Sequence, residues 1–180
     1  MRSLAQFVAF QLVWFAAVLG AGAGLNWAGP LALVPYLAWM LAGERDRMRL
    51  GARWIVAGLL GSLVDCGLAS LGLLAYPKAD PGWPAWIVPP FIVSLWIAFA
   101  TLPHVSLAWL APRPVLAALL GAIGGPLSFA AGARLGAVGP GDSPPLTNLV
   151  LAVEYALATP LLLRWTDRRP RPRGLSRNEP

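Results

Sequence analysis

The sequence predicts an all-α protein: a polytopic integral membrane bundle of six transmembrane helices, with both termini in the cytoplasm. Hydrophobic residues fill 57% of the 180 positions and charged residues only 12%. Soluble domains carry roughly a quarter charged residues. The apolar residues fall into six runs, each close to the ~20 residues that a helix needs to cross a bilayer. Basic residues collect in alternate connections, as the positive-inside rule describes.

The six runs are joined by short polar connections, which leave no room for a separate soluble domain. Lipid offers no partners to backbone polar groups, and the runs lack the alternation of a β-barrel strand, so each run is expected to be a helix. One transmembrane domain over 1–165 is expected to hold the spans 3–22, 25–43, 54–76, 86–103, 115–136 and 146–164. The basic, Pro-rich tail 166–180 is expected to be disordered and cytoplasmic.

Two of these elements leave alternatives open. The run 3–22 ends at Ala-Gly-Ala, which resembles a signal-peptidase site, although its apolar stretch is long for a signal peptide. The segment 104–110 either extends the fourth helix or lies along the membrane interface, which Trp109 would suit. An interfacial belt also accounts for the tryptophans near the expected span ends, which are Trp27, Trp54, Trp83, Trp86, Trp109 and Trp165.

Orientation follows from the Lys and Arg residues of the connections. With the N-terminus inside, twelve of the fourteen lie on the cytoplasmic side, and only Lys78 and Arg134 lie on the other. The net charge of +6 is therefore a topology signal, and no nucleic-acid partner is expected. The expected partner is the lipid bilayer, whose anionic headgroups would attract the basic tail. A membrane-protein partner or a second copy of the chain is left open.

Two carboxylates lie inside expected spans, Asp65 in the third and Glu154 in the sixth. Ionisable residues are expensive in lipid and indicate a functional site by default. Counted from the outer ends, the two reach similar depths, and close together they would not both ionise. They predict a proton or cation relay or, alternatively, a structural interhelical hydrogen bond. Ser128 could serve as a partner, and Arg134 either reaches the surface or pairs with Glu154.

His104 is the single histidine and falls near the cytoplasmic face, with Ser106 close by in the sequence. His104 is either an ordinary interfacial residue or part of a polar cluster. No Ser-His-Asp arrangement can be assigned from the sequence. One cysteine and one histidine do not make a metal site within one chain. We expect neither a metal nor a cofactor.

The fifth run carries the densest motif, with the residues Gly121, Gly124, Gly125, Pro126, Gly132 and Gly136. Gly121 and Gly125 are four apart, as are Gly132 and Gly136, a spacing that lets another helix approach closely. Pro126 removes a backbone donor in mid-span and is expected to kink the helix. The motif is either a packing device or a broken helix that lines a site.

The segment Gly-Gly-Pro-Leu-Ser-Phe-Ala-Ala-Gly-Ala-Arg-Leu-Gly-Ala (124–137), with Trp-Ile-Ala-Phe-Ala-Thr-Leu (96–102) upstream, resembles a bacterial family of small inner-membrane proteins. This family is the domain of unknown function 2878. The resemblance covers nearly the whole chain, up to about Trp165. It implies a multi-pass protein of the bacterial cytoplasmic membrane and adds no catalytic residue.

Three functions remain open from the sequence. The first is a carrier that handles a small molecule, proton or cation at a polar site between the third, fifth and sixth helices. The second is a scaffold or assembly subunit without a pathway of its own. The third is an accessory or enzyme that acts on lipid at the cytoplasmic face through His104. A carrier needs its carboxylates at a cavity, an enzyme needs a polar cleft, and a scaffold needs an exposed groove of small residues.

The topology gives a first prediction. Reporter fusions after Gly43, Asp80, Arg113, Asp142 and Arg177 should lie alternately inside, outside, inside, outside and inside. An outside signal from the fusion at Arg113 would contradict six spans.

Overall fold

The computed structural model describes residues 2–166 and shows a mostly helical chain. The helices are α1 (Arg2–Gly22), α2 (Ala28–Leu41), α3 (Arg47–Ser70), α4 (Pro90–Thr101), α5 (Pro114–Arg134) and α6 (Pro144–Thr166). Two 3₁₀ turns follow α4, namely η1 (Leu102–His104) and η2 (Ala108–Leu110). Two short strands, β1 (Leu74–Ala75) and β2 (Gly139–Pro140), pair antiparallel. Apart from Thr166, the expected tail lies outside the described residues.

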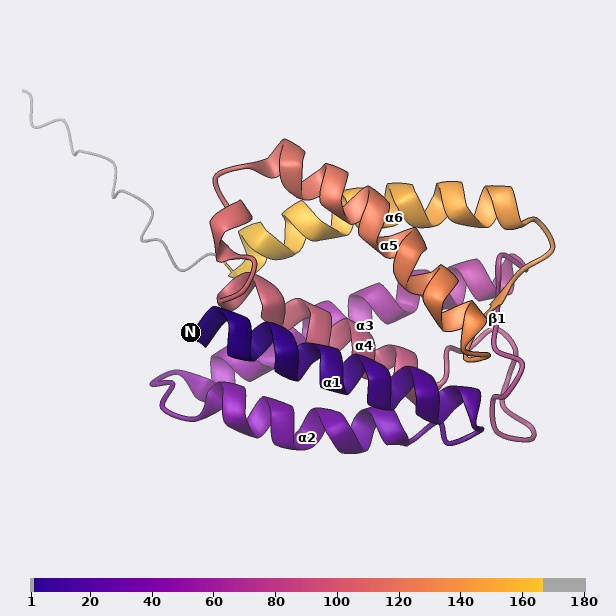
Figure 1. Cartoon of the computed structure of the whole chain (residues 1–180), viewed down its shortest axis with the longest axis horizontal. Coiled ribbons are helices and arrows are strands. Elements are labelled where there is room, and N and C mark those ends of the chain that lie inside the picture. The colour runs from indigo at the N-terminus through magenta and orange to yellow at the C-terminus, as the bar shows by residue number, and fades with distance from the viewer. Residues whose placement is uncertain (1, 167–180) are drawn as a thin grey trace, which may run out of the picture.

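Successive helices run back and forth along one common direction (Figure 1). The α1–α2 turn, the connection 71–89 and the α5–α6 turn gather at one end of the molecule, which we call the β end because it holds β1 and β2. The N-terminus, the α2–α3 turn and the turns η1 and η2 lie at the opposite end. The most extensive helix pairs are α5 with α6, α3 with α4, and α1 with α2.

Three helices match the expected spans closely, because α1, α5 and α6 each begin and end within two residues of them. The other three were misplaced by the apolar pattern. α2 is shorter at both ends, α4 begins four residues later than expected, and α3 lies six or seven residues earlier. α3 begins in the Arg-rich segment because Arg, Met, Leu and Ala favour a helix whatever their polarity.

Gly72 explains where α3 ends. Its φ is +71°, and the Leu73 N–H donates to the Leu68 carbonyl at 2.9 Å, which together form a glycine-terminated helix end. The apolar residues that follow belong to β1 and its connection. Asp65 is therefore five residues before the end of α3, roughly 7 Å along the axis, and not near its middle.

The segment after α4 continues that helix only as a 3₁₀ turn to His104 and forms no further α-helix. It folds into η1 and η2, with Pro103, Ser106 and Leu110 buried against the bundle. At the other end of α4, Pro90 is the first helical residue, a position where proline costs no hydrogen bond.

Four helices, α1, α3, α5 and α6, are long and apolar enough to cross a membrane. α2 and α4 are apolar but shorter. Large apolar side chains stand exposed on the outer faces, among them Leu12 (66% exposed), Leu31 (72%) and Leu63 (67%). Soluble monomers rarely expose apolar patches of this extent, so the structure is compatible with a membrane protein. Trp54, expected at an interface, is instead fully buried in the core, whereas Trp27 and Trp165 are exposed near helix ends.

Glycines let the helix pairs approach closely. A Cβ on Gly121 would collide with the Tyr155 carbonyl of α6, and one on Gly125 would collide with the Tyr155 ring. Gly132 faces Val138 more loosely, and a Cβ on Gly124 would meet nothing within 4 Å. Gly136 does not belong to a packing face, because it follows the end of α5 with a φ of +76°. α5 runs without a break through Pro126, so it is not a broken helix, and its kink stays a prediction.

The contact between Gly125 and Tyr155 gives a second prediction. Gly125→Leu should lower the free energy of unfolding in detergent by about 3 kcal/mol, because the new side chain must displace a packed ring. Gly124→Leu is the matched control on the same helix and should change stability little. Equal losses for the two variants would show that α5 does not depend on close approach at Gly125.

Candidate functional site

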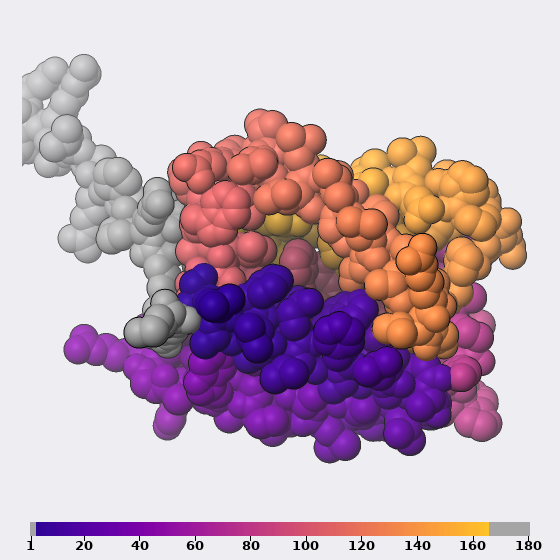
Figure 2. Space-filling view, viewed as in Figure 1, coloured from indigo at the N-terminus to yellow at the C-terminus, as the bar shows by residue number. Residues whose placement is uncertain are grey.

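A cavity of about 540 Å³ lies between α1, α4, α5 and α6. Small-molecule sites commonly have volumes of roughly 300–1,000 Å³. The cavity exists because α1 packs on α2 and α4 while α5 packs on α6, which leaves α1 and α5 apart. Figure 2 shows the resulting hollow between α1 (indigo) and α5 (salmon to orange).

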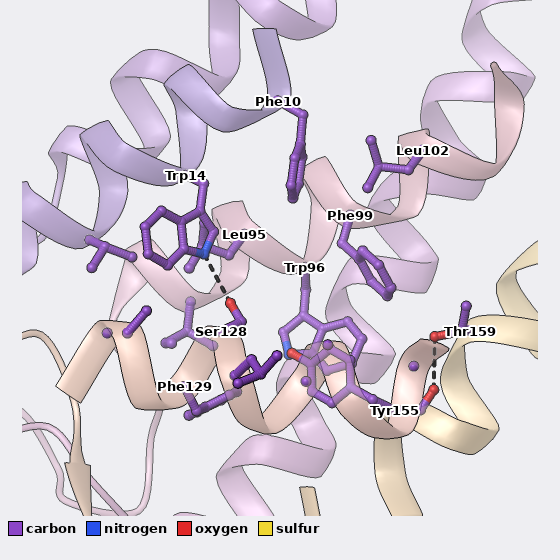
Figure 3. A pocket seen from close by; sticks show the side chains of 18 of the residues that line it. Phe10, Trp14, Leu95, Trp96, Phe99, Leu102, Ser128, Phe129, Tyr155 and Thr159 are labelled. Atoms are coloured by element: carbon purple, nitrogen blue, oxygen red, sulfur yellow. Dashed lines mark hydrogen bonds between the residues drawn. The ribbon is translucent and has the colours of Figure 1, made fainter. Parts of the chain in front are cut away.

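The walls of this cavity are mainly apolar, and eight aromatic side chains contribute to them. The rings come from α1, α4, α5 and α6 and belong to Phe7, Phe10, Trp14, Phe91, Trp96, Phe99, Phe129 and Tyr155. Figure 3 shows several of them turned toward a common space. Polar groups are few, namely Gln11, Asp65, Ser128 and Thr159. A mostly apolar pocket with a small number of polar groups is typical of a small-molecule site.

Asp65 of α3 lies in the cavity wall with 0% of its surface exposed. The indole N–H of Trp96 donates to its Oδ2 at 2.7 Å. Gly61, one turn earlier on α3, makes room for that indole, since a Cβ there would collide with the ring. The other oxygen, Oδ1, is buried and finds no hydrogen-bond partner among residues 2–166.

Tyr155 of α6 extends this line of contacts across the bundle. Its ring stacks on Trp96 with centroids 5.0 Å apart and an interplanar angle of 22°. It also lies 5.8 Å from the Phe99 ring and rests on Gly125 of α5. The contacts Asp65–Trp96–Tyr155–Gly125 thus join α3, α4, α6 and α5, and both central rings also form cavity wall (Figure 3).

Ser128 of α5 also lies in the cavity wall. Its Oγ accepts a hydrogen bond from the Trp14 indole N–H at 3.0 Å (Figure 3). This bond links α1 and α5. The hydroxyl of Thr159 is already used, because it donates to the Tyr155 carbonyl at 2.8 Å.

Glu154 does not line the cavity, although its neighbour on α6, Tyr155, does. Both carboxylate oxygens are buried and have no hydrogen-bond partner within the described chain. Glu154 and Asp65 lie within electrostatic reach of each other. Of the two alternatives for Arg134, the pair with Glu154 is thus not formed among these residues, and the Arg134 side chain is exposed at the end of α5.

Tyr76 completes this buried group from the connection 71–89. Its hydroxyl is buried and has no hydrogen-bond partner among residues 2–166. Burial, followed by the nearby charges of Asp65, Cys66 and Glu154, raises the pKa of the Tyr76 phenol well above its usual range. Asp65, Tyr76 and Glu154 therefore bring unsatisfied oxygens from three segments into one region. The sequence did not indicate Tyr76, because it was expected to end a helix.

His104 lies far from the cavity residues Asp65 and Ser128, at the end of the bundle opposite the β end. Its Nε2 is 3.2 Å from Glu44 Oε1, and its ring meets the Trp54 ring edge-to-face at 5.7 Å. The Ser106 hydroxyl lies 2.6 Å from Gln6 Oε1 and donates to the Ser3 carbonyl at 2.9 Å. The polar cluster of His104 and Ser106 that the sequence suggested stays a prediction.

A buried polar network at that same end was not predicted. Gln6 donates to the Thr101 carbonyl at 2.9 Å and accepts from the Ser106 N–H at 2.7 Å. The Tyr36 hydroxyl lies 2.6 Å from Thr101 Oγ1. Gln6 and Thr101 have 0% exposure, so the network fastens α1, α2 and α4 together without offering a site. The glutamine within an apolar run was the signal that could have found it.

Within residues 2–166, no three His, Cys, Asp or Glu side chains come together as they would to hold a metal ion. The arrangement is an apolar cavity, rich in aromatic rings, with one buried carboxyl group in its wall.

A family model described as protein of unknown function (DUF2878) matches residues 3–161. The match covers most of the chain, and the chain belongs to this family. No curated protein and no solved structure matches it.

The Asp65–Trp96 hydrogen bond gives a third prediction. Trp96→Phe should destabilise the fold by about 1–3 kcal/mol more than Trp54→Phe, because only the first change leaves a buried carboxyl without its donor. Both indoles are buried, but the Trp54 N–H has no acceptor among residues 2–166. Unfolding of both variants in detergent measures the difference. Equal destabilisation would mean that the hydrogen bond contributes nothing.

Proposed function

We propose that this member of the DUF2878 family is a six-span membrane protein that binds a lipophilic small molecule through an opening that faces the bilayer. The observation that carries this proposal is the aromatic cavity of about 540 Å³ between α1 and α5, with Asp65 in its wall. An apolar molecule dissolved in the membrane would enter sideways between these two helices, without crossing a water-filled path.

The arrangement of the helices supports six spans. Successive helices run in opposite directions, so each connection falls at the end that the topology requires (Figure 1). α2 has 14 residues and α4 with η1 has 15, roughly 21–23 Å at 1.5 Å per residue, which is less than a ~30 Å hydrocarbon core. Non-helical backbone at membrane depth is acceptable where protein covers it, and Pro103, Ser106 and Leu110 after α4 are buried.

The charges support an N-in orientation. Among the described residues, the β end carries Lys78 and Arg134 as its basic side chains, and the opposite end carries Arg45, Arg47, Arg49, Arg53, Arg113 and Arg164. The positive-inside rule places the Arg-rich end in the cytoplasm. We propose that the protein lies in a bacterial cytoplasmic membrane.

The two other functions find less support. A scaffold would need the glycine face of α5 free for a partner, but Gly121 and Gly125 already pack against α6 of the same chain. An enzyme at the cytoplasmic face would use His104, which contacts the carboxylate of Glu44 and does not line the cavity. Small-molecule binding is the function that the geometry supports best.

Gly124 offers a direct test, because it lines the cavity and its Cβ position has no neighbour within 4 Å. Gly124→Trp should fill the cavity without disturbing the backbone. Gly67→Trp is the matched control, since Gly67 is also helical and open but does not line the cavity.

The probe is triphenylphosphine oxide, a neutral aromatic molecule, measured by equilibrium dialysis against the purified full chain in a neutral detergent. Wild type and Gly67→Trp should bind it saturably, and Gly124→Trp should lose at least about tenfold in affinity, since the indole takes the ligand's place. Binding that is unsaturable, or equal in all three proteins, would contradict the proposed site.

A further inference from the structure

We infer that the ligand of the cavity is a lipophilic cation, an amine or onium compound whose positive charge lies beside Asp65. This inference rests on the proposed function and adds the charge of the ligand. Two features of the wall support the inference. They are the eight aromatic side chains, and the buried carboxyl group of Asp65 with its unsatisfied oxygen.

The aromatic lining favours a cation over other ligands. The faces of Trp, Tyr and Phe rings carry partial negative charge and attract cations, most strongly where water is excluded. Trp96, Tyr155 and Phe99 lie within 6 Å of one another by ring centroids, and Asp65 is hydrogen-bonded to the first of them. None of the described residues that line the cavity is Lys or Arg, so an anion would find no opposite charge there.

Asp65 adds the specific contact. Trp96 holds Oδ2, whereas Oδ1 is buried without a donor among residues 2–166. An unsatisfied buried acceptor is costly, and a ligand N–H or a positive charge would remove that cost. A neutral aromatic hydrocarbon would fill the same space and leave the oxygen unsatisfied.

The titratable groups around Asp65 do not oppose a cation. Among the described residues they are Cys66 on its own helix, Tyr76 in the connection 71–89, and Glu154 and Tyr155 on α6. All of these groups are acids, so none of them is a base that would repel a cation.

The experiment compares two probes of nearly the same shape, methyltriphenylphosphonium, which is a cation with no titrating proton, and triphenylphosphine oxide, which is neutral. Equilibrium dialysis with the full chain in neutral detergent should give roughly tenfold tighter binding of the phosphonium.

Asp65→Asn tests the residue, because its amide oxygen can still accept from Trp96. The variant should lose the preference for the phosphonium, while its affinity for the oxide stays within about twofold of wild type. Equal affinity of wild type for both probes, with both lost in Gly124→Trp, would overturn the cation inference and leave the cavity standing. Failure of both probes to bind would overturn the proposed function as well.

Discussion

The hydrogen bond from the Trp96 indole to Asp65 fixes the centre of the bundle. It forms because Gly61 leaves space for the ring on α3, and the same ring then stacks on Tyr155, which in turn needs the bare surface of Gly125. Close packing on both sides allows neither ring to shift far. Four helices are thus held in register by one line of contacts, and the inner side of that line is the aromatic wall of the cavity. Packing and candidate site therefore depend on the same side chains.

Hydropathy located α1, α5 and α6 closely because each is a single apolar run between polar turns. It misplaced α3, since a helix end and a following apolar strand have the same hydropathy, and only Gly72 distinguishes them. The sequence could single out Asp65 and Ser128 as polar residues in apolar runs. It could not show that Trp96 would be the partner of Asp65, because the choice of partner depends on which turns of α3 and α4 face each other. The sequence left open whether Arg134 pairs with Glu154 or reaches the surface, and among the described residues no donor reaches Glu154.

Hydrogen bonds fasten both ends of the bundle. The end of the molecule that carries most of the arginines is held by the Gln6, Thr101 and Ser106 network. The β end is held by hydrogen bonds such as those from Gly141 and Thr147 to the Leu73 carbonyl. Between these two ends, the Trp14–Ser128 hydrogen bond links α1 and α5, which are the two helices on either side of the hollow in Figure 2. This arrangement is compatible with the proposed entry of a ligand between α1 and α5.

The central claim is that the cavity opens to lipid and not to water. A nitroxide attached at position 124, as Gly124→Cys in a Cys66→Ser background, would report this in reconstituted bilayers through its collisions with oxygen and with a water-soluble nickel chelate. A label at Leu119, which is exposed on α5, provides the lipid-facing reference. If the cavity opens to lipid, we expect high oxygen accessibility and low nickel accessibility at position 124. The oxygen accessibility should fall when methyltriphenylphosphonium is added. High nickel accessibility at that position would show that the cavity opens to water.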